Sequence, residues 1–352
     1  MSKESQWVRP KPVLDAPNNI VLRQRDTQQV VTWLREDRPV WLRGHFGLGV
    51  RLIEALYAVQ EVVDGLDFAS RRGLAQEHRA EARGLLVRVC NHRIDVPGAP
   101  EIGFLKELYS ELDVFFLPLI DIQALFGAWQ SYDRGTMFPV LGHRLHPFWG
   151  TYLPNRMTHL ELFGTWLSQY SGSRNVGIDV GVGCGVLALM MCRAGFTRVI
   201  GTDSNVNAVE SVVRETQRVT YPTPVELIHT DLLSAVSETP DLIVFNPPWV
   251  PGEPADTIEQ ALMYRPGLFE RFFEQAHARL DSDGRIVLVF SNVLGLVRPD
   301  APHPIEQELC RERFILKAKQ QRKVKGTKGA DGRTRRTRER VEIWELARAP
   351  ES

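Results

Sequence analysis

The stretch Val176-Gly-Ile-Asp-Val-Gly-Val-Gly-Cys-Gly185 decides the fold of this chain. Its first five residues are mostly apolar and predict a buried strand, and glycines dominate the five that follow. Glycine at Gly181, Gly183 and Gly185 lets the backbone turn sharply and lets a ligand approach it closely at the carboxyl end of a strand. Amides at the start of the next helix would add favourable partial charge. The stretch therefore predicts a strand, a ligand-binding turn and a helix, in that order.

This turn differs from the usual dinucleotide-binding turn. The pattern GxGxxG requires glycine at its sixth position, where this chain has Val186. NAD is therefore disfavoured as the ligand. A tight strand-to-helix turn that binds nothing is the alternative interpretation of these glycines.

Strands and helices alternate on both sides of the glycine turn. We expect strands at 176–180, 198–203, 225–229, 242–245 and 284–290, with helices at 158–170, 185–194, 205–220 and 267–280. Such alternation is typical of an α/β fold, here a Rossmann-like doubly wound and largely parallel sheet. A helix at 305–311 and a hairpin over 314–346 with basic tips are expected to follow.

The first part of the chain has a different pattern. Apolar spacing is mostly helical from Val21 to Ala82, 85–90 has the character of a strand, and 104–116 that of a helix. Residues 1 to about 20 are polar and are expected to form a poorly ordered lead-in. We expect two domains: residues 1–145 as a helix-rich α+β domain for substrate recognition, and residues 146–352 as the second domain.

Acidic residues follow the first three strands of the second domain. Asp179 belongs to the glycine motif, and Asp203 ends the next strand, where a carboxylate can accept two ribose hydroxyls in bonds worth ~1.5–3 kcal/mol each. Asp231 follows the third strand, where an acidic side chain can accept an adenine amino group. Aspartate at such positions is also a common helix cap, and that alternative is stronger for Asp231 than for Asp203.

The turn Asn246-Pro247-Pro248-Trp249 follows the apolar run 242–245. A planar NH2 group is a poor nucleophile because its lone pair is conjugated. The Asn246 side-chain oxygen and the Pro247 carbonyl can accept its two hydrogens and draw the nitrogen toward tetrahedral geometry. Prolines hold these acceptors in place, and Trp249 can stack on a planar substrate. An ordinary turn without a substrate is the alternative interpretation.

Taken together, these motifs resemble the class I S-adenosylmethionine (SAM)-dependent methyltransferases of the small-domain and HemK-type groups, over residues of about 146 to 295. The resemblance implies SAM as the cofactor, bound by the glycine motif with Asp179, Asp203 and Asp231. It implies N-methylation of a protein amide or a nucleobase. In the HemK-type group a Pro-Arg-Pro-x-Thr-Glu stretch borders the cofactor. Residues 153–159 keep Pro154, Arg156 and Thr158 of that stretch, but depart from it at Asn155, Met157 and His159. The usual NPPY is NPPW here.

The substrate is expected to be a macromolecule. From Lys317 to Arg340 there are eleven Lys or Arg residues and two acidic residues, although the whole chain has a formal net charge of zero. This segment can contact RNA or the ribosome, or it can be an ordinary solvated hairpin. Two other functions stay open: a small-molecule N-methyltransferase that has no use for the basic hairpin, and a methyltransferase-like RNA-binding module without turnover.

Composition narrows the remaining choices. No apolar run approaches the ~18 residues that a membrane helix needs, and the first residues do not look like a signal peptide. Four scattered cysteines fit a cytoplasmic protein better than a disulfide framework. His143, His146 and His159 lack a carboxylate or cysteine at useful spacing, so no metal site is expected.

Overall fold

The computed structural model describes residues 6–22, 27–58, 68–154, 156–254, 260–324, 327–328, 334–335 and 338–350. Contacts divide the chain into two units, Met1–Asp133 and Arg134–Ser352. The division lies earlier in the chain than the expected boundary near residue 145, because the short hairpin of β6 (Thr136–Phe138) and β7 (His143–Leu145) belongs to the second unit. Asn155, one of the departures from the HemK-type stretch, lies outside the described residues.

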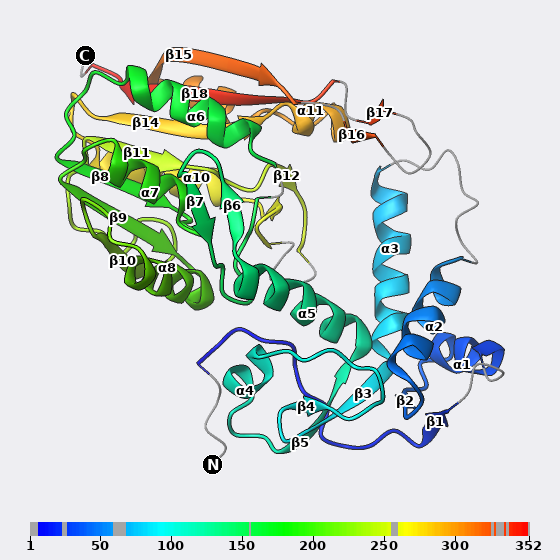
Figure 1. The fold of residues 1–352 in the computed structure, drawn as a ribbon. Helices are drawn as coiled ribbons and strands as arrows, with labels where there is room; N and C mark the ends of the chain where they lie inside the picture. The colour runs from blue at the N-terminus through cyan, green and yellow to red at the C-terminus, as the bar shows by residue number, and fades with distance from the viewer. Residues whose placement is uncertain are drawn as a thin grey trace. The chain divides into compact units, whose positions relative to one another are not determined.

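A seven-stranded sheet forms the centre of the second unit (Figure 1). Its strands are, in spatial order, β10 (Val225–His229), β9 (Arg198–Asp203), β8 (Val176–Val180), β11 (Leu242–Phe245), β14 (Arg285–Ser291), β18 (Arg340–Arg348) and β15 (Phe314–Lys323). The first five run parallel, and β18 is antiparallel to both of its neighbours. The predicted Rossmann-like α/β fold is confirmed. Within the segment expected to form the terminal hairpin, the structure pairs β15 with β18.

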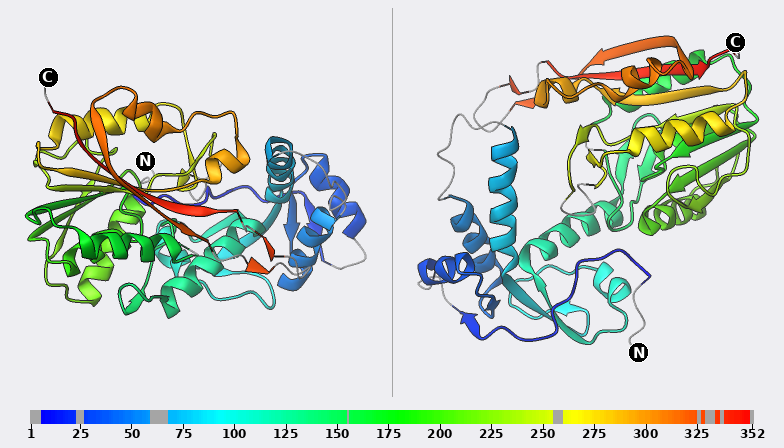
Figure 2. Two further views of the ribbon diagram at one scale, coloured as in Figure 1. Left: turned by 90° about the horizontal axis from the view of Figure 1, so that it is seen from above. Right: turned by 180° about the vertical axis from the view of Figure 1, so that it is seen from behind.

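Helices cover both faces of this sheet (Figures 1 and 2). On one face lie α6 (Thr158–Gln169), α7 (Val186–Arg193) and α8 (Val206–Arg218), and on the other lie α10 (Leu268–Arg279) and α12 (Pro304–Leu309). The short α11 (Val293–Val297) follows β14. Along β11, Leu242 and Val244 pack into the first layer, and Ile243 and Phe245 into the second. A strand buried on both faces needs apolar residues without interruption, which is why the sheet strands were recognisable as apolar runs.

The register of the central strands brings their carboxyl ends together. Val180 of β8 lies beside Thr202 of β9 and beside Phe245 of β11. The residues that follow these strands therefore meet at one edge of the sheet, which is where open parallel sheets bind ligands.

Among its described residues, the first unit has a five-stranded mixed sheet and five helices (Figure 1). The strands are β1 (Asn19–Val21), β2 (Val40–Leu42), β3 (Leu85–Cys90), β4 (Arg93–Ile94) and β5 (Val114–Pro118). The helices are α1 (Thr27–Arg35), α2 (Phe46–Ala58), α3 (Phe68–Arg83), α4 (Phe104–Leu108) and α5 (Leu119–Arg134). β1, β2 and β3 run parallel, and β5 is antiparallel to β3.

Two expectations about the first unit were wrong. The single helix expected over 104–116 is the short helix α4 followed by a turn and the buried strand β5, because the run Val114–Pro118 pairs with β3. Residues 1 to about 20 were expected to be poorly ordered, but those that the structure describes, from residue 6 onward, pack on this unit. Val13 forms a β-bridge with Phe116, and the Tyr109 hydroxyl donates to the Pro10 carbonyl at 2.8 Å.

Candidate functional site

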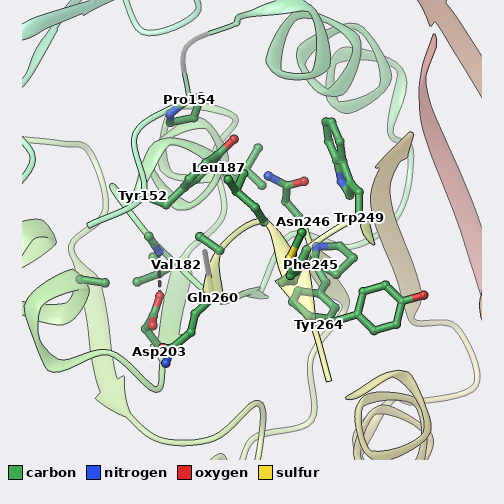
Figure 3. A pocket seen from close by; sticks show the side chains of 18 of the residues that line it. Tyr152, Pro154, Val182, Leu187, Asp203, Phe245, Asn246, Trp249, Gln260 and Tyr264 are labelled. Carbon is green, nitrogen blue, oxygen red and sulfur yellow. Dashed lines mark hydrogen bonds between the residues drawn. The ribbon is translucent and has the colours of Figure 1, made fainter. Parts of the chain in front are cut away.

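A cavity of about 580 Å³ opens at the carboxyl ends of β8, β9 and β11 (Figure 3). All of its lining residues belong to the second unit. The predicted site residues in its lining are Arg156, Thr158, Asp179, Gly181, Gly183, Asp203, Asp231, Asn246, Pro247, Pro248 and Trp249. Gly185 is the predicted residue that does not line the cavity.

The glycine motif forms a turn that is bonded to the neighbouring strand. The Val182 amide donates to the Thr202 carbonyl at 2.8 Å, and the Gly183 amide donates to Asp203 Oδ2 at 3.0 Å. Gly181 and Gly183 have φ values of 67° and 50°, in the left-handed region that side chains disfavour.

Gly185 serves packing instead. It caps the amino end of α7 at a φ of 84°, and a methyl group added there would lie 2.9 Å from the Val212 side chain on α8. The turn therefore uses two glycines at the cavity and a third where a helix packs closely.

Asp203 holds two backbone amides. Its Oδ2 accepts from Gly183, and its Oδ1 accepts from the Asn205 amide at 2.8 Å. Burial raises the pKa of this carboxyl, and the two amides oppose that rise. The cap of α8 is Asn205, whose side-chain oxygen accepts from the Asn207 amide at 3.0 Å. Asp203 therefore binds the glycine turn and leaves the helix cap to its neighbour.

Asp179 is a buried carboxyl, with 1% of its surface exposed. Its Oδ2 accepts from the Ala188 amide at 2.9 Å, whereas its Oδ1 has no hydrogen-bond partner among the described residues. Burial raises the pKa of this carboxyl well above its usual value, the Asp203 charge adds to the rise, and the Ala188 amide opposes it. An acceptor without a partner beside a glycine turn fits a ligand that brings its own donor.

Asp231 lies at the exposed rim of the cavity. Its carboxylate forms an ion pair with Arg271 of α10 at 3.5 Å. The turn that follows is closed through the main-chain oxygen of Asp231, which accepts from the Ser234 amide at 3.1 Å. Arg271 was not identified from the sequence, since nothing in its spacing relates it to Asp231.

The Asn-Pro-Pro-Trp turn begins where β11 ends. Asn246 Oδ1 is buried and, within the described part of the chain, accepts no hydrogen bond. Trp249 is held from two sides: its indole N–H donates to the Val289 carbonyl of β14 at 3.2 Å, and its ring packs edge-on against His159 with centroids 5.9 Å apart. In Figure 3 the side chains of Asn246 and Trp249 extend from the turn into the upper part of the view. The turn thus presents one unpaired acceptor beside one anchored aromatic ring.

A short β-ladder continues this wall of the cavity. β12 (Val250–Pro251) pairs with β13 (Met263–Tyr264), which brings Tyr264 and Gln260 to the lining (Figure 3). Because this pairing joins segments without strong strand patterns, neither residue was predicted from the sequence.

The lining also includes an ion pair between two residues that are far apart in the sequence. Arg156, just ahead of α6, donates to Glu339, just ahead of β18, at 3.1 Å. Tyr152 also lines the cavity, and burial raises the pKa of its hydroxyl to about 12. Tyr152 belongs to none of the motifs described above, and it was not predicted from the sequence.

His143 and His159 contact different residues. His143 Nε2 bonds the Tyr221 hydroxyl at 2.6 Å, and His159 packs on Trp249. In the ranges that the structure describes, no three His, Cys, Asp or Glu residues are grouped as a metal site requires, and no helix is long and apolar enough to span a bilayer.

Comparison with known proteins gives a family match over this unit. Residues 162–319 match the family model of the methyltransferase small domain. A relative from Methanocaldococcus jannaschii named "Putative protein N5-glutamine methyltransferase" is 24% identical over 125 residues, which are 34% of this chain and 62% of the relative. The chain therefore matches less than two thirds of that relative's length.

Solved structures with a similar arrangement include two methylases. A ribosomal protein L11 methylase from Lactobacillus delbrueckii is 21% identical, with a TM-score of 0.40, and the match covers 59% of this chain and 85% of that one. An rRNA methylase from Streptococcus thermophilus is 13% identical, with a TM-score of 0.38, and the match covers 56% of this chain and all of that one.

Proposed function

We propose that the chain is a SAM-dependent N-methyltransferase that modifies a planar NH2 group held by the Asn246 turn. The observation that carries this proposal is the buried oxygen Asn246 Oδ1, which no described residue satisfies. It lies on the wall of the same cavity as the glycine turn. An unsatisfied buried acceptor costs ~1–3 kcal/mol, a cost that a bound N–H donor removes.

The glycine turn and the three aspartates form the proposed cofactor side. Gly181 and Gly183 let a ligand lie against the backbone, Asp203 can accept ribose hydroxyls, and Asp231 can accept an amino group at the rim. The unpaired Asp179 Oδ1 offers one more acceptor. When bound, SAM supplies an electrophilic methyl group on its sulfonium. Arg156 and Thr158 border the same side.

The turn residues perform the proposed chemistry on the acceptor. Asn246 Oδ1 and the Pro247 carbonyl accept the two hydrogens of the NH2 group, so the nitrogen lone pair is freed from conjugation and directed. Their positions are set before the substrate arrives, which is where electrostatic stabilisation is most effective. Trp249 supplies a flat wall whose orientation is fixed by its bond to Val289. Orientation of the two reactants supplies most of the acceleration in this proposal.

A macromolecular substrate is part of the proposal. Val324 and Glu339 both line the cavity, and the amide of the first donates to the carbonyl of the second at 3.0 Å. These residues flank the most basic part of the chain; of residues 325–337, only 327–328 and 334–335 lie within the described ranges. The described basic residues next to Val324 and Glu339 in the chain are Lys323, Arg338 and Arg340, and they suit a substrate that carries phosphates. The free cysteines Cys90, Cys184, Cys192 and Cys310 fit a cytoplasmic reaction.

The test is methyl transfer from radiolabelled SAM into an extract of cells that lack the gene. The label is sorted by treatment with protease, by treatment with nuclease and by dialysis. We expect label in a macromolecular fraction that only one of the two enzymes removes. Label lost on dialysis alone would instead support the small-molecule methyltransferase. SAM binding without label in any fraction would contradict turnover and support a binding module.

A further inference from the structure

His159 is a buried polar residue in the cavity wall that has no role so far in the proposed reaction. It is the second residue of α6, 3% of its surface is exposed, and it lines the cavity. Its Nε2 is buried and finds no hydrogen-bond partner in the described ranges. Burial lowers the pKa of the ring to about 4, so the imidazole is neutral at pH 7. A neutral imidazole has one N–H donor and one acceptor.

The ring is held against the same turn that carries Asn246. Its plane stands at 89° to the indole of Trp249, and that indole is fixed in turn by the Val289 carbonyl. Two buried polar atoms without partners, Asn246 Oδ1 and His159 Nε2, are thus associated with one turn and one cavity. Both positions, 159 and 249, are also departures from the HemK-type pattern.

We propose that His159 is a specificity-determining residue, which donates from Nε2–H to an acceptor atom on the carbon that bears the substrate NH2. The inference rests on the proposed function. An amide carbonyl oxygen and the ring nitrogen beside a nucleobase amino group are both such acceptors. Asn246 and Pro247 accept from the NH2 group, and His159 satisfies the atom beside it. A plain amine without this neighbouring acceptor would leave Nε2 unpaired, and sites built for a hydrogen bond reject such analogues.

The test uses three flat probes of similar size: 2-aminopyridine, benzamide and aniline. The first carries a ring nitrogen beside its NH2, the second carries a carbonyl, and aniline carries neither. Binding to the full chain is measured by NMR titration at pH 8 with S-adenosylhomocysteine present. We expect His159→Leu to weaken binding of 2-aminopyridine, benzamide or both by about fivefold to tenfold and to leave aniline unchanged, because one hydrogen bond is lost. His159→Gln keeps a side-chain donor. It should retain at least half of the wild-type preference for the acceptor-bearing probes over aniline.

His303 provides a matched control. Its Nδ1 is also buried without a partner among the described residues, its ring lies 5.0 Å from that of Trp344, and burial lowers its pKa too, but it does not line the cavity. His303→Leu should change thermal stability and leave the probe ratios unchanged. If His159 had only a structural role, His159→Leu would likewise change thermal stability and leave the ratios of the probe affinities unchanged.

Each outcome decides the inference. If His159→Leu weakens the binding of 2-aminopyridine alone, the result favours a nucleobase as the substrate. If it weakens the binding of benzamide alone, the result favours a carboxamide. Equal changes for all three probes with His159→Leu, or no binding by either acceptor-bearing probe to the wild type, would overturn it. The same samples are assayed for transfer of labelled methyl to the probes and to the extract. If the wild type prefers the acceptor-bearing probes in binding but transfers no methyl group to any probe or to the extract, the proposed function is contradicted and the inference about His159 is not.

Discussion

The backbone amide of Gly183 donates to Asp203 Oδ2 at 3.0 Å, which joins the glycine turn after β8 to the carboxylate at the end of β9. Two motifs that are separate in the sequence are therefore one structural unit. The carboxylate that is proposed to accept ribose hydroxyls also sets the position of the turn against which the cofactor would lie. A change at Asp203 should consequently affect cofactor affinity through both effects.

Asp203→Asn is expected to weaken SAM binding about tenfold to a hundredfold. The amide oxygen can keep one backbone bond, but the charge-assisted bonds to ribose hydroxyls, worth ~1.5–3 kcal/mol, are lost. Isothermal titration calorimetry measures the affinity. Asp281→Asn, at an exposed position outside the cavity, is the control. An affinity within twofold of the wild type for Asp203→Asn would exclude the ribose role.

Gly185→Ala and Gly181→Ala should separate stability from binding. At Gly185 the added methyl meets Val212 at 2.9 Å and the φ of 84° is strained, so we expect a loss of about 2–4 kcal/mol in the free energy of unfolding. At Gly181 the nearest atom lies 3.6 Å away, so the loss should be about 1–2 kcal/mol, with weaker SAM binding as the main effect. Urea unfolding and calorimetry check both. The reverse order of stabilities would contradict this account of the two glycines.

Asp179→Asn is expected to stabilise the fold at pH 8 while weakening SAM binding. The folded pKa of Asp179 lies well above its usual value because of burial. The carboxyl therefore costs no stability below its unfolded pKa, and the cost grows as pH rises through the folded pKa. Asparagine can still accept from the Ala188 amide and carries no charge. Thermal unfolding between pH 5 and 8 should show a higher Tm for the variant at pH 8 and a smaller gain at pH 5. A lower Tm for Asp179→Asn than for the wild type at pH 8 would refute this account of the buried carboxyl.

The effect of His159 on folding stability depends on pH in the opposite direction to that of Asp179. Its folded pKa of about 4 lies below the usual 6.5 because burial disfavours the charged ring. Between these values the unfolded chain binds a proton that the folded chain does not, so stability falls as pH falls from 6.5 to 4, by at most about 3 kcal/mol. His159→Leu should lose less stability than the wild type between pH 7 and 5 in urea unfolding. The exposed His229→Leu serves as the control, and equal losses in all three proteins would contradict the burial effect.

The second unit was predictable because its central strands are buried on both faces. The runs Val176–Val180 and Leu242–Phe245 are apolar and are followed at once by glycine or by Asn-Pro-Pro, so both their type and their ends were visible. In the first unit, short apolar runs did not distinguish a helix from a strand. Only pairing with β3 makes Val114–Pro118 a strand.

Dependence on tertiary contacts also limits which residues of the site could be predicted from the sequence. Residues that belong to a motif were identified directly, whereas those brought in by tertiary contacts were not. Tyr264 reaches the cavity through the pairing of β12 with β13, Glu339 through its ion pair with Arg156, and Arg271 through the approach of α10 to the rim. His159 was noted as a departure from the HemK-type stretch and weighed as a metal ligand, but its contact with Trp249 was not predicted, since it depends on how α6 lies on the sheet.

The most direct test of the central claim compares Asn246→Ala with the wild type for both SAM affinity and methyl transfer to the extract. Asn175→Ala, at an exposed position whose side chain bonds Ser173, is the matched control. We predict that all three proteins bind SAM within twofold of one another. We also predict that Asn246→Ala alone loses transfer, by at least a hundredfold, because losing one preorganised group of this kind costs about 10²–10³ in rate. Transfer by Asn246→Ala at the wild-type rate would contradict the claim that this turn holds the acceptor nitrogen.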